Sequence, residues 1–280
     1  MNYRHVFHAG NFADLAKHAI VSRLMSDLTA SPGPLTVIDT HAGAGLYDLE
    51  DPAARRTGEA EAGVGRLLRA QGAPAAFIPI RMAMETVNPQ GGVRFYPGSP
   101  LLIASALRPG DRYIACELRP DDCDVLRLNL SAKRGTELHL GDGWRRADDM
   151  APKAPARLLV LIDPPFEQGD DYAQCVNLTG RLIERNPAAI VAIWLPIKDL
   201  NTFDVFLGDL EDSVGDTTLL VAEVRLRRLD DPMRLNGCAM VVTNPSPGLN
   251  ETAAEVVDWL AANVGEAGGL GRVTLIGSPA

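Results

Sequence analysis

Residues 35–45 read LTVIDTHAGAG, an apolar run that ends in Asp39 and passes into a turn with two glycines, Gly43 and Gly45. The run lacks apolar–polar alternation, which predicts a strand buried on both faces of a sheet. Glycines directly after such a strand let the backbone approach a ligand closely, as in nucleotide-binding turns. Asp48 stands where a dinucleotide fingerprint needs its third glycine. The stretch therefore predicts a nucleotide-binding turn, with a tight structural turn as the alternative.

Similar apolar runs recur along the chain and alternate with segments of helical periodicity. Buried strands are expected at residues 35–40, 112–117, 157–163, 188–195, 218–226 and 238–243, with shorter ones at 137–140 and 273–276. Helices are expected at residues 14–28, 120–130, 172–185 and 251–264. Strands that alternate with helices predict βαβ units and a mostly parallel sheet covered on both faces. In such α/β sheets, ligands bind beyond the carboxyl ends of the strands.

One interval, residues 48–95, departs from this alternation. It is rich in Ala, Arg, Glu and Gly and contains no run that resembles a buried strand. We therefore predict a helical subdomain at 48–95, inserted into one α/β domain formed by residues 1–47 and 96–280.

The composition places the chain among ordinary globular proteins. It has 280 residues, of which 46% are hydrophobic and 22% charged, and its formal net charge is −9. The acidic balance excludes a uniformly basic nucleic-acid coat. No apolar run reaches the roughly 17 to 25 residues of a membrane span, and the first twenty residues do not resemble a signal peptide. We expect a soluble cytoplasmic protein, acting as a monomer and without a membrane partner.

The cysteines argue against a disulfide framework or a zinc site. Cys116, Cys123, Cys175 and Cys238 form no CxxC pair and no zinc-ligand spacing with histidine. We expect reduced thiols and no structural metal.

Two further predicted strands end in carboxylates. Glu117 ends one strand, where it could accept hydrogen bonds from the ribose hydroxyls of a nucleoside or serve as a helix N-terminal or surface acid. It lies far beyond the roughly 20 residues expected after the glycine turn, and the inserted segment accounts for the excess. Asp142, followed by Gly143, could receive an adenine amino group, but an Asp–Gly pair is equally typical of an ordinary turn.

The most specific motif is Asp163-Pro164-Pro165-Phe166, directly after the apolar run at 158–162. An exocyclic adenine amine is a poor nucleophile because its lone pair is delocalised into the ring. Asp163 and the Pro164 carbonyl could accept its two hydrogens and free that lone pair. The prolines would fix the backbone, and Phe166 would offer a face for an extruded base. The alternative is a proline-rich strand exit with a core phenylalanine.

The N-terminal segment combines aromatic, basic and histidine residues. Three histidines lie in the first eighteen residues, but their spacing does not match a compact metal-ligand set. They could be surface residues, or the segment could form a cap over cofactor and substrate. In a cap, Tyr3, Arg4 and Lys17 would supply stacking and phosphate contacts.

Several other positions allow two interpretations. The late basic cluster, made of Arg225, Arg227, Arg228 and Arg234, could bind a polyanion or form a solvated edge. Residues 96–100, YPGSP, predict a rigid turn from which a hydroxyl could reach a cofactor. Trp194 is expected in the core or in a pocket wall without a chemical role.

Taken together, these stretches resemble one family, the ribosomal large subunit methyltransferase J family. Asp39 with the following glycine turn resembles motif I of S-adenosylmethionine-dependent methyltransferases. The stretches that carry the resemblance, in family order, are YRHVFHAGNFADLAKH (3–18), DTHAGAG (39–45), RTGE (56–59), YPGSP (96–100), CELRP (116–120), DGW (142–144), DPPF (163–166) and GCAMVVTNP (237–245). They span nearly the whole chain.

The resemblance implies a Rossmann-like methyltransferase sheet with a small helical insertion. It implies that S-adenosylmethionine is contacted by His18, His41, Gly43, Ser99, Glu117, Asp142 and Gly143. It also implies that Asp163 is catalytic, with Pro164 and Phe166 beside it, and that Tyr3 meets RNA. The family commonly has Tyr where this chain has Phe166, and we associate the position of Phe12 with His.

The activity implied by the resemblance is methylation of N6 of an adenosine in bacterial 23S ribosomal RNA. Two alternatives are a DNA adenine-N6 methyltransferase and a non-catalytic nucleic-acid-binding factor linked to the use of external DNA. The net charge of −9 requires the basic residues to gather on one face if RNA is bound. Those residues are in the N-terminal segment, at Arg55, Arg56, Arg66 and Arg69, and at 225–234.

Overall fold

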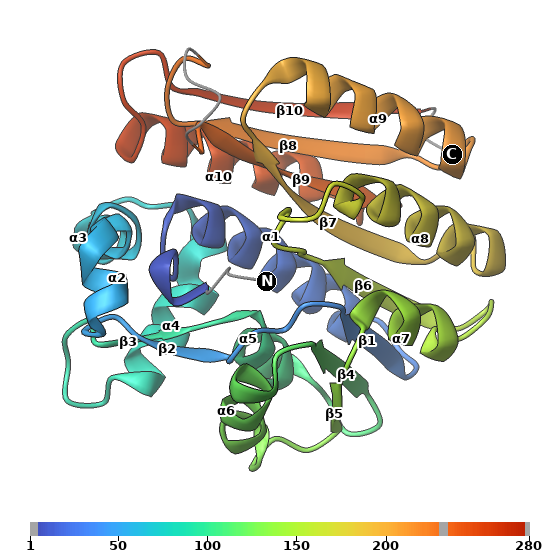
Figure 1. Ribbon diagram of the computed structural model, residues 1–280, viewed down its shortest axis with the longest axis horizontal. Coiled ribbons are helices and arrows are strands. Elements are labelled where there is room, and N and C mark those ends of the chain that lie inside the picture. The colour runs from blue at the N-terminus through green and yellow to red at the C-terminus, as the bar shows by residue number, and fades with distance from the viewer. Residues whose placement is uncertain (1–4, 230–234, 278–280) are drawn as a thin grey trace.

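The structure is a computed structural model that describes residues 5–229 and 235–277. The strands of its main sheet are β1 (Leu35–Asp39), β4 (Arg112–Glu117), β5 (Thr136–Leu140), β6 (Arg157–Ile162), β7 (Ile190–Ile197), β8 (Leu219–Arg225), β9 (Gly237–Thr243) and β10 (Leu270–Ile276). Within the described residues these eight strands lie in the order β10-β8-β9-β7-β6-β1-β4-β5 (Figure 1). The five strands from β7 to β5 in that order are parallel, whereas β9, β8 and β10 pair antiparallel. The predicted mixed α/β fold with a mostly parallel sheet is confirmed.

Helices cover both faces of this sheet. They are α1 (Phe12–Ala30), α5 (Ser99–Ala106), α6 (Pro120–Leu130), α7 (Gly143–Met150), α8 (Asp171–Arg185), α9 (Leu200–Val214) and α10 (Leu249–Asn263). One core packs α1, α5, α6 and α10 against one face, and a second packs α7, α8 and α9 against the other (Figure 1). Strand β6 serves both cores because its side chains alternate: Leu159 and Leu161 enter the first, Val160 and Ile162 the second.

The interval after β1 is mainly helical. It begins and ends with two short strands, β2 (Leu46–Asp48) and β3 (Phe95–Pro97), which pair antiparallel. Between them lie α2 (Pro52–Thr57), the π-helix η2 (Glu61–Gly65), α3 (Arg66–Arg69), the 3-10 helix η3 (Ala75–Phe77) and α4 (Ile78–Val87). Val64, Phe77 and Ile80 from this interval share the core of α1, so these helices pack directly on the parallel-sheet domain.

The element boundaries show where local patterns were insufficient. Helix α6 and strand β4 coincide with their predicted ranges, and most other predicted elements shift by one to three residues. Helices α5, α7 and α9 were not predicted, because they are short or interrupted by charged residues and glycine. The rigid turn expected at 96–100 is wrong: the chain leaves β3 at Pro97 and starts α5 at Ser99. A three-residue strand is too short to show a period.

The turn after β1 is fixed between its two neighbouring strands. The Thr40 N–H donates to the Leu161 carbonyl of β6 (3.0 Å), and the Ala42 N–H donates to the Cys116 carbonyl of β4 (2.9 Å). The order of the sheet reverses here, since β4 lies on one side of β1 and β6 on the other. In open α/β sheets such a reversal opens a crevice beyond the strand ends.

Candidate active site

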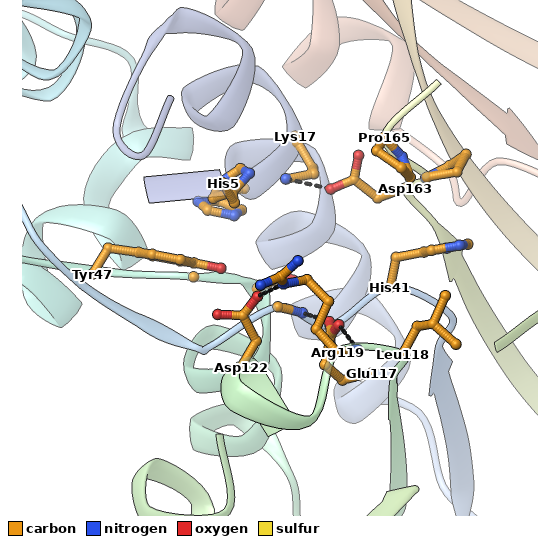
Figure 2. A pocket seen from close by; sticks show the side chains of 16 residues that line it. His5, Lys17, His41, Tyr47, Glu117, Leu118, Arg119, Asp122, Asp163 and Pro165 are labelled. Carbon is orange, nitrogen blue, oxygen red and sulfur yellow. Dashed lines mark hydrogen bonds and ion pairs between the residues drawn. The ribbon is translucent and has the colours of Figure 1, made fainter. Parts of the chain in front are cut away.

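A cleft of about 670 Å³, its open mouth included, lies at this reversal. Its walls come from the ends of β1, β4 and β6, from the first half of α1, and from the start of α5. The predicted site residues that line it are Lys17, His18, His41, Gly43, Ser99, Glu117, Asp163 and Pro164. Figure 2 shows Lys17 and Asp163 on one side of the cleft, with Glu117 and Arg119 opposite. The fold thus brings together residues that are far apart in the sequence.

The carboxylate of Asp39 lies beneath the cleft floor and is fully buried. It accepts hydrogen bonds from the Ser99 hydroxyl (3.1 Å), the Tyr113 hydroxyl (3.2 Å) and the His41 N–H (3.3 Å). Burial, together with the nearby charge of Asp163, raises the pKa of Asp39 to about 7. Ser99, predicted to contact a cofactor, therefore also ties α5 to the end of β1.

Glu117 fixes the glycine turn from the end of β4. Its carboxylate accepts the Gly43 N–H (2.8 Å) and the Arg119 N–H (2.8 Å), and burial raises its pKa. Gly43 has a φ of +67°, and a Cβ there would lie 2.3 Å from the Tyr47 hydroxyl. The turn therefore requires glycine at this position, both for its backbone conformation and for the close approach of Tyr47.

Two histidines, the buried His18 and the half-buried His41, line the same cleft. Burial lowers the pKa of His18 to about 3 and that of His41 to about 4, so both imidazoles are neutral near pH 7. His41 contacts the Thr40 hydroxyl through Nδ1 (2.7 Å) and packs edge-on against Trp144, with ring centroids 4.8 Å apart. His18 contacts the Tyr96 hydroxyl through Nδ1 (2.8 Å), while its Nε2 has no hydrogen-bond partner among the described residues.

An ion-pair bridge joins α1 to the end of β6. The Lys17 ammonium lies 2.5 Å from Asp163 Oδ2 and 3.0 Å from Asp14 Oδ1, and its side chain is only 5% exposed (Figure 2). Burial alone would lower the pKa of Lys17, but the two carboxylates raise it well above its usual value. Asp14 also accepts hydrogen bonds from the Gly10 N–H (2.9 Å) and contacts His5 Nε2 (3.0 Å).

A second pocket adjoins the cleft and shares Lys17 and Asp163 with it. Its apolar wall is formed by Pro165, Phe166, Trp194, Pro196 and Leu235. Phe166 has a φ of +51°, a strained backbone conformation for a residue other than glycine. Its ring lies 4.7 Å from that of Tyr172, measured between centroids.

Asp142 and Gly143 do not line the cleft. The Asp142 carboxylate caps α7 by accepting the Trp144 N–H (2.9 Å) and the Arg145 N–H (3.3 Å). Gly143 is required by packing, since a Cβ would lie 1.8 Å from the Thr40 carbonyl oxygen. In this structure the pair supports the end of β1, which agrees with the alternative of an ordinary turn; a role in cofactor binding stays a prediction.

Most basic residues considered for RNA binding are engaged in pairs. Arg225 lies 2.5 Å from Glu223, and Arg227 lies 2.7 Å from Glu266. Pairing is also seen at Arg55 with Glu50 (3.4 Å), Arg69 with Glu61 (2.7 Å) and Arg66 with the Asn263 carbonyl (2.7 Å). Tyr3, Arg4 and Arg234 lie outside the described residues, so their roles stay predictions.

Sequence reasoning missed several residues that line the two pockets or fix the side chains within them. Asp14, Tyr47, Tyr96 and Arg119 were not assigned to the site, although each lies in a stretch that carried the resemblance or directly beside one. Their partners are distant in the sequence: His18 and Tyr96 are 78 residues apart. Within the described residues, no group of three or more His, Cys, Asp and Glu side chains could hold a metal ion. Nor is any helix there both long and apolar enough to cross a membrane.

The sheet order, the glycine turn after β1 and the acids at the ends of β4 and β6 define a Rossmann-like fold of the methyltransferase type. The chain belongs to the family whose model is described as ribosomal RNA large subunit methyltransferase D, RlmJ, which matches residues 32–276.

Two relatives carry the name ribosomal RNA large subunit methyltransferase J. The protein of Escherichia coli (strain K12) is 32% identical over 268 residues, covering 96% of this chain and 95% of that protein. The protein of Haemophilus influenzae (strain ATCC 51907 / DSM 11121 / KW20 / Rd) is also 32% identical, covering 93% and 92%. The crystal structure of protein LPL1258 from Legionella pneumophila superposes with a TM-score of 0.88 at 25% identity, covering 95% of this chain and 98% of that one.

Proposed function

We propose that this protein transfers the methyl group of S-adenosylmethionine to N6 of an adenosine in 23S ribosomal RNA. The observation that carries the proposal is the position of Asp163, which lines both the polar cleft and the adjoining apolar pocket. Membership of the RlmJ family supports the same activity, since its relatives are named as methyltransferases of large-subunit ribosomal RNA.

The residues of the first cleft fit this cofactor. Glu117 retains lone pairs that can accept ribose hydroxyls, because each of its oxygens accepts one backbone N–H. His18 Nε2 is a buried polar atom without a partner, as expected of a group that meets a ligand. The Gly43 turn leaves its backbone accessible, and Ser99 lies beside it. When bound, S-adenosylmethionine supplies an electrophilic methyl group on a sulfonium.

The second pocket fits an extruded adenine. Phe166 and Trp194 offer faces on which a base can stack, and the apolar wall excludes water from it. Asp163 lines both pockets and Pro164 lines the first cleft. In this proposal the amine donates one hydrogen to the Asp163 carboxylate and one to the Pro164 carbonyl, while its lone pair faces the first cleft. Asp163 then acts mainly by orienting the amine. The Lys17 ammonium, 2.5 Å from Oδ2, holds the carboxylate in place.

The decisive variant is Asp163→Ala. We expect methyl transfer to unmodified 23S RNA to fall on the order of a thousandfold, while binding of S-adenosylhomocysteine, measured by calorimetry, persists. Asp216→Ala, at an exposed position outside both pockets, is the matched control and should keep full activity. Undiminished transfer by Asp163→Ala would defeat the assignment.

The substrate class is tested separately. Mass mapping of methyladenosine in 23S RNA from cells that lack the protein should reveal one adenosine without its methyl group. Side-by-side labelling of RNA and DNA with radioactive cofactor should favour the RNA. If only the DNA were labelled, the protein would be a DNA adenine methyltransferase, and the roles proposed for the site residues would stay the same.

A further inference from the structure

The pair formed by Tyr96 and His18 joins the segment returning from the insertion to the cleft wall. Tyr96 lies on β3 and is fully buried, and its ring stacks on the His18 imidazole with centroids 5.6 Å apart and an interplanar angle of 22°. Gly10 lies close to the same ring, since a Cβ there would be 3.3 Å from it. The hydroxyl of Tyr96 lies 2.8 Å from His18 Nδ1.

Both partners are neutral near pH 7. Burial lowers the pKa of His18 to about 3, and burial raises the pKa of Tyr96 well above its usual value. The imidazole therefore carries one ring hydrogen, on Nδ1 or on Nε2, and the phenol keeps its own. Which nitrogen carries the hydrogen decides whether the cleft meets a donor or an acceptor.

The hydrogen bonds of the pair select one tautomer. Among the described residues, Tyr96 has no hydrogen-bond partner other than His18. If His18 Nδ1 were the donor, the phenolic hydrogen would be buried without an acceptor, which is unfavourable. If the phenol donates instead, its hydrogen is paired with Nδ1 and the ring hydrogen lies on Nε2, where a ligand in the cleft can accept it. The Asp14 carboxylate, 3.9 Å from Nε2, favours a hydrogen there but is too distant for a hydrogen bond.

We propose that Tyr96 is a positioning residue for the methyl donor: by donating to His18 Nδ1, it makes Nε2–H a hydrogen-bond donor that faces the cofactor cleft. This rests on the proposed function. The Nε2–H donor would recognise an acceptor oxygen of S-adenosylmethionine. We assign it the carboxylate of the methionine part, because that is the anionic group of the cofactor. The ribose hydroxyls are donors and suit the Glu117 carboxylate, which lines the same cleft. The segment that returns from the insertion thereby influences cofactor binding, because Tyr96 directly follows residue 95.

The tautomer can be read directly in the protein without ligand. The chain has five histidines, so long-range nitrogen–proton NMR spectra of the ¹⁵N-histidine-labelled protein can be assigned with single variants. We expect the Nε2–H pattern for His18 in the natural sequence and a shift toward Nδ1–H in Tyr96→Phe. Tyr113→Phe removes another fully buried phenol, one bonded to Asp39, and should leave the His18 pattern unchanged. An Nδ1–H pattern in the natural sequence would overturn the proposal.

Binding gives a second, independent readout. We expect Tyr96→Phe to raise the dissociation constant for S-adenosylhomocysteine by about three- to tenfold, the effect of one neutral hydrogen bond. Should Tyr96→Phe not fold, His18→Gln, which keeps an N–H near Nε2, should bind more tightly than His18→Asn. The reverse order, or unchanged binding by Tyr96→Phe, contradicts the proposal. Failure of the natural protein to bind S-adenosylhomocysteine would instead defeat the proposed function, and the NMR pattern would still decide the tautomer.

Discussion

The ends of β1 and β6 lie side by side in the sheet and each presents an aspartate, yet the two carboxylates have opposite surroundings. Asp39 is fully buried and accepts hydrogen bonds from two hydroxyls and a backbone N–H, and no cation among the described residues forms an ion pair with it. Asp163 is 16% exposed at its side chain and is paired with the Lys17 ammonium. Of the two aspartates at neighbouring strand ends, Asp39 is therefore bound by neutral hydrogen-bond donors and Asp163 by an ammonium group.

This difference suggests a structural role for Asp39 and a substrate-binding role for Asp163. Burial and the nearby charge of Asp163 favour the protonated form of Asp39 and outweigh the hydrogen bonds from Ser99 and the His41 N–H, which favour the charged form. The environment of Asp39 therefore suits a group that fixes the turn and does not change partners. Asp163 faces two pockets and shares its cation with Asp14, so it can accept a new donor while Lys17 remains bound to Asp14. Under the proposed function, a substrate amine can therefore donate to Asp163 while the Lys17 ammonium stays paired with Asp14.

The largest effect is expected from Lys17→Met, which removes the cation paired with Asp163. Asp14 and Asp163 would then face each other without their shared cation. Removing one member of a buried ion pair typically lowers the free energy of unfolding by about 3 to 5 kcal/mol. We expect a loss of that order in urea unfolding near pH 8, together with at least a tenfold drop in methyl transfer.

The matched control is Lys153→Met, at an exposed position away from both pockets. It should leave the free energy of unfolding within about 0.5 kcal/mol of the natural value. Equal stability of the two variants would mean that Lys17 does not neutralise the carboxylates.

The positions of the acidic residues at the strand ends could be predicted from the sequence. The apolar runs before Asp39, Glu117 and Asp163 are local, and they suffice to predict that these acids meet at one edge of a parallel sheet. The DPPF motif was predicted as a site because two prolines after a buried strand fix a backbone carbonyl. The structure places these acids beside the glycine turn, as that argument requires.

What surrounds the acids could not be predicted, because it depends on contacts between distant segments. Ser99 and Asp39 are 60 residues apart, and their hydrogen bond forms only when α5 begins directly after a three-residue strand. Lys17 and Asp163 are 146 residues apart. Helical periodicity places Lys17 on α1 but does not show that the first half of this helix is buried on all sides.

A smaller effect is expected from Asp39, and it should be seen in the pH dependence of the free energy of unfolding. The pKa of Asp39 is raised to about 7 in the folded protein, above its unfolded value of about 3.8. The folded state therefore binds more protons between these values, and stability falls as pH rises from about 4 to 7. Asp39→Asn removes this contribution, so its stability relative to the natural protein should improve over that range, by about 4 kcal/mol at most.

Urea unfolding at pH 4.5, 5.5, 6.5 and 7.5 measures this difference. Asp142→Asn, which alters an exposed carboxylate at the cap of α7 and keeps a capping oxygen, is the control and should show little change in relative stability with pH. A relative stability of Asp39→Asn that stays constant from pH 4.5 to 7.5 would contradict a buried carboxyl that titrates near 7.

The smallest effect is expected from Phe166, whose ring lies in the apolar pocket beside Asp163. Its substitution tests whether the two pockets lined by Asp163 bind different ligands. Phe166 lines the apolar pocket and not the first cleft, so Phe166→Ala should lower kcat/KM for RNA by a factor of roughly 5 to 150, which corresponds to the about 1 to 3 kcal/mol of one stacked base. Binding of S-adenosylhomocysteine should not change, because its proposed site is the first cleft, which Phe166 does not line. Phe166→Tyr keeps the ring and should keep most of the activity. If Phe166→Ala weakened cofactor binding as strongly as RNA methylation, the two pockets would form a single ligand site, and the division of roles around Asp163 would be wrong.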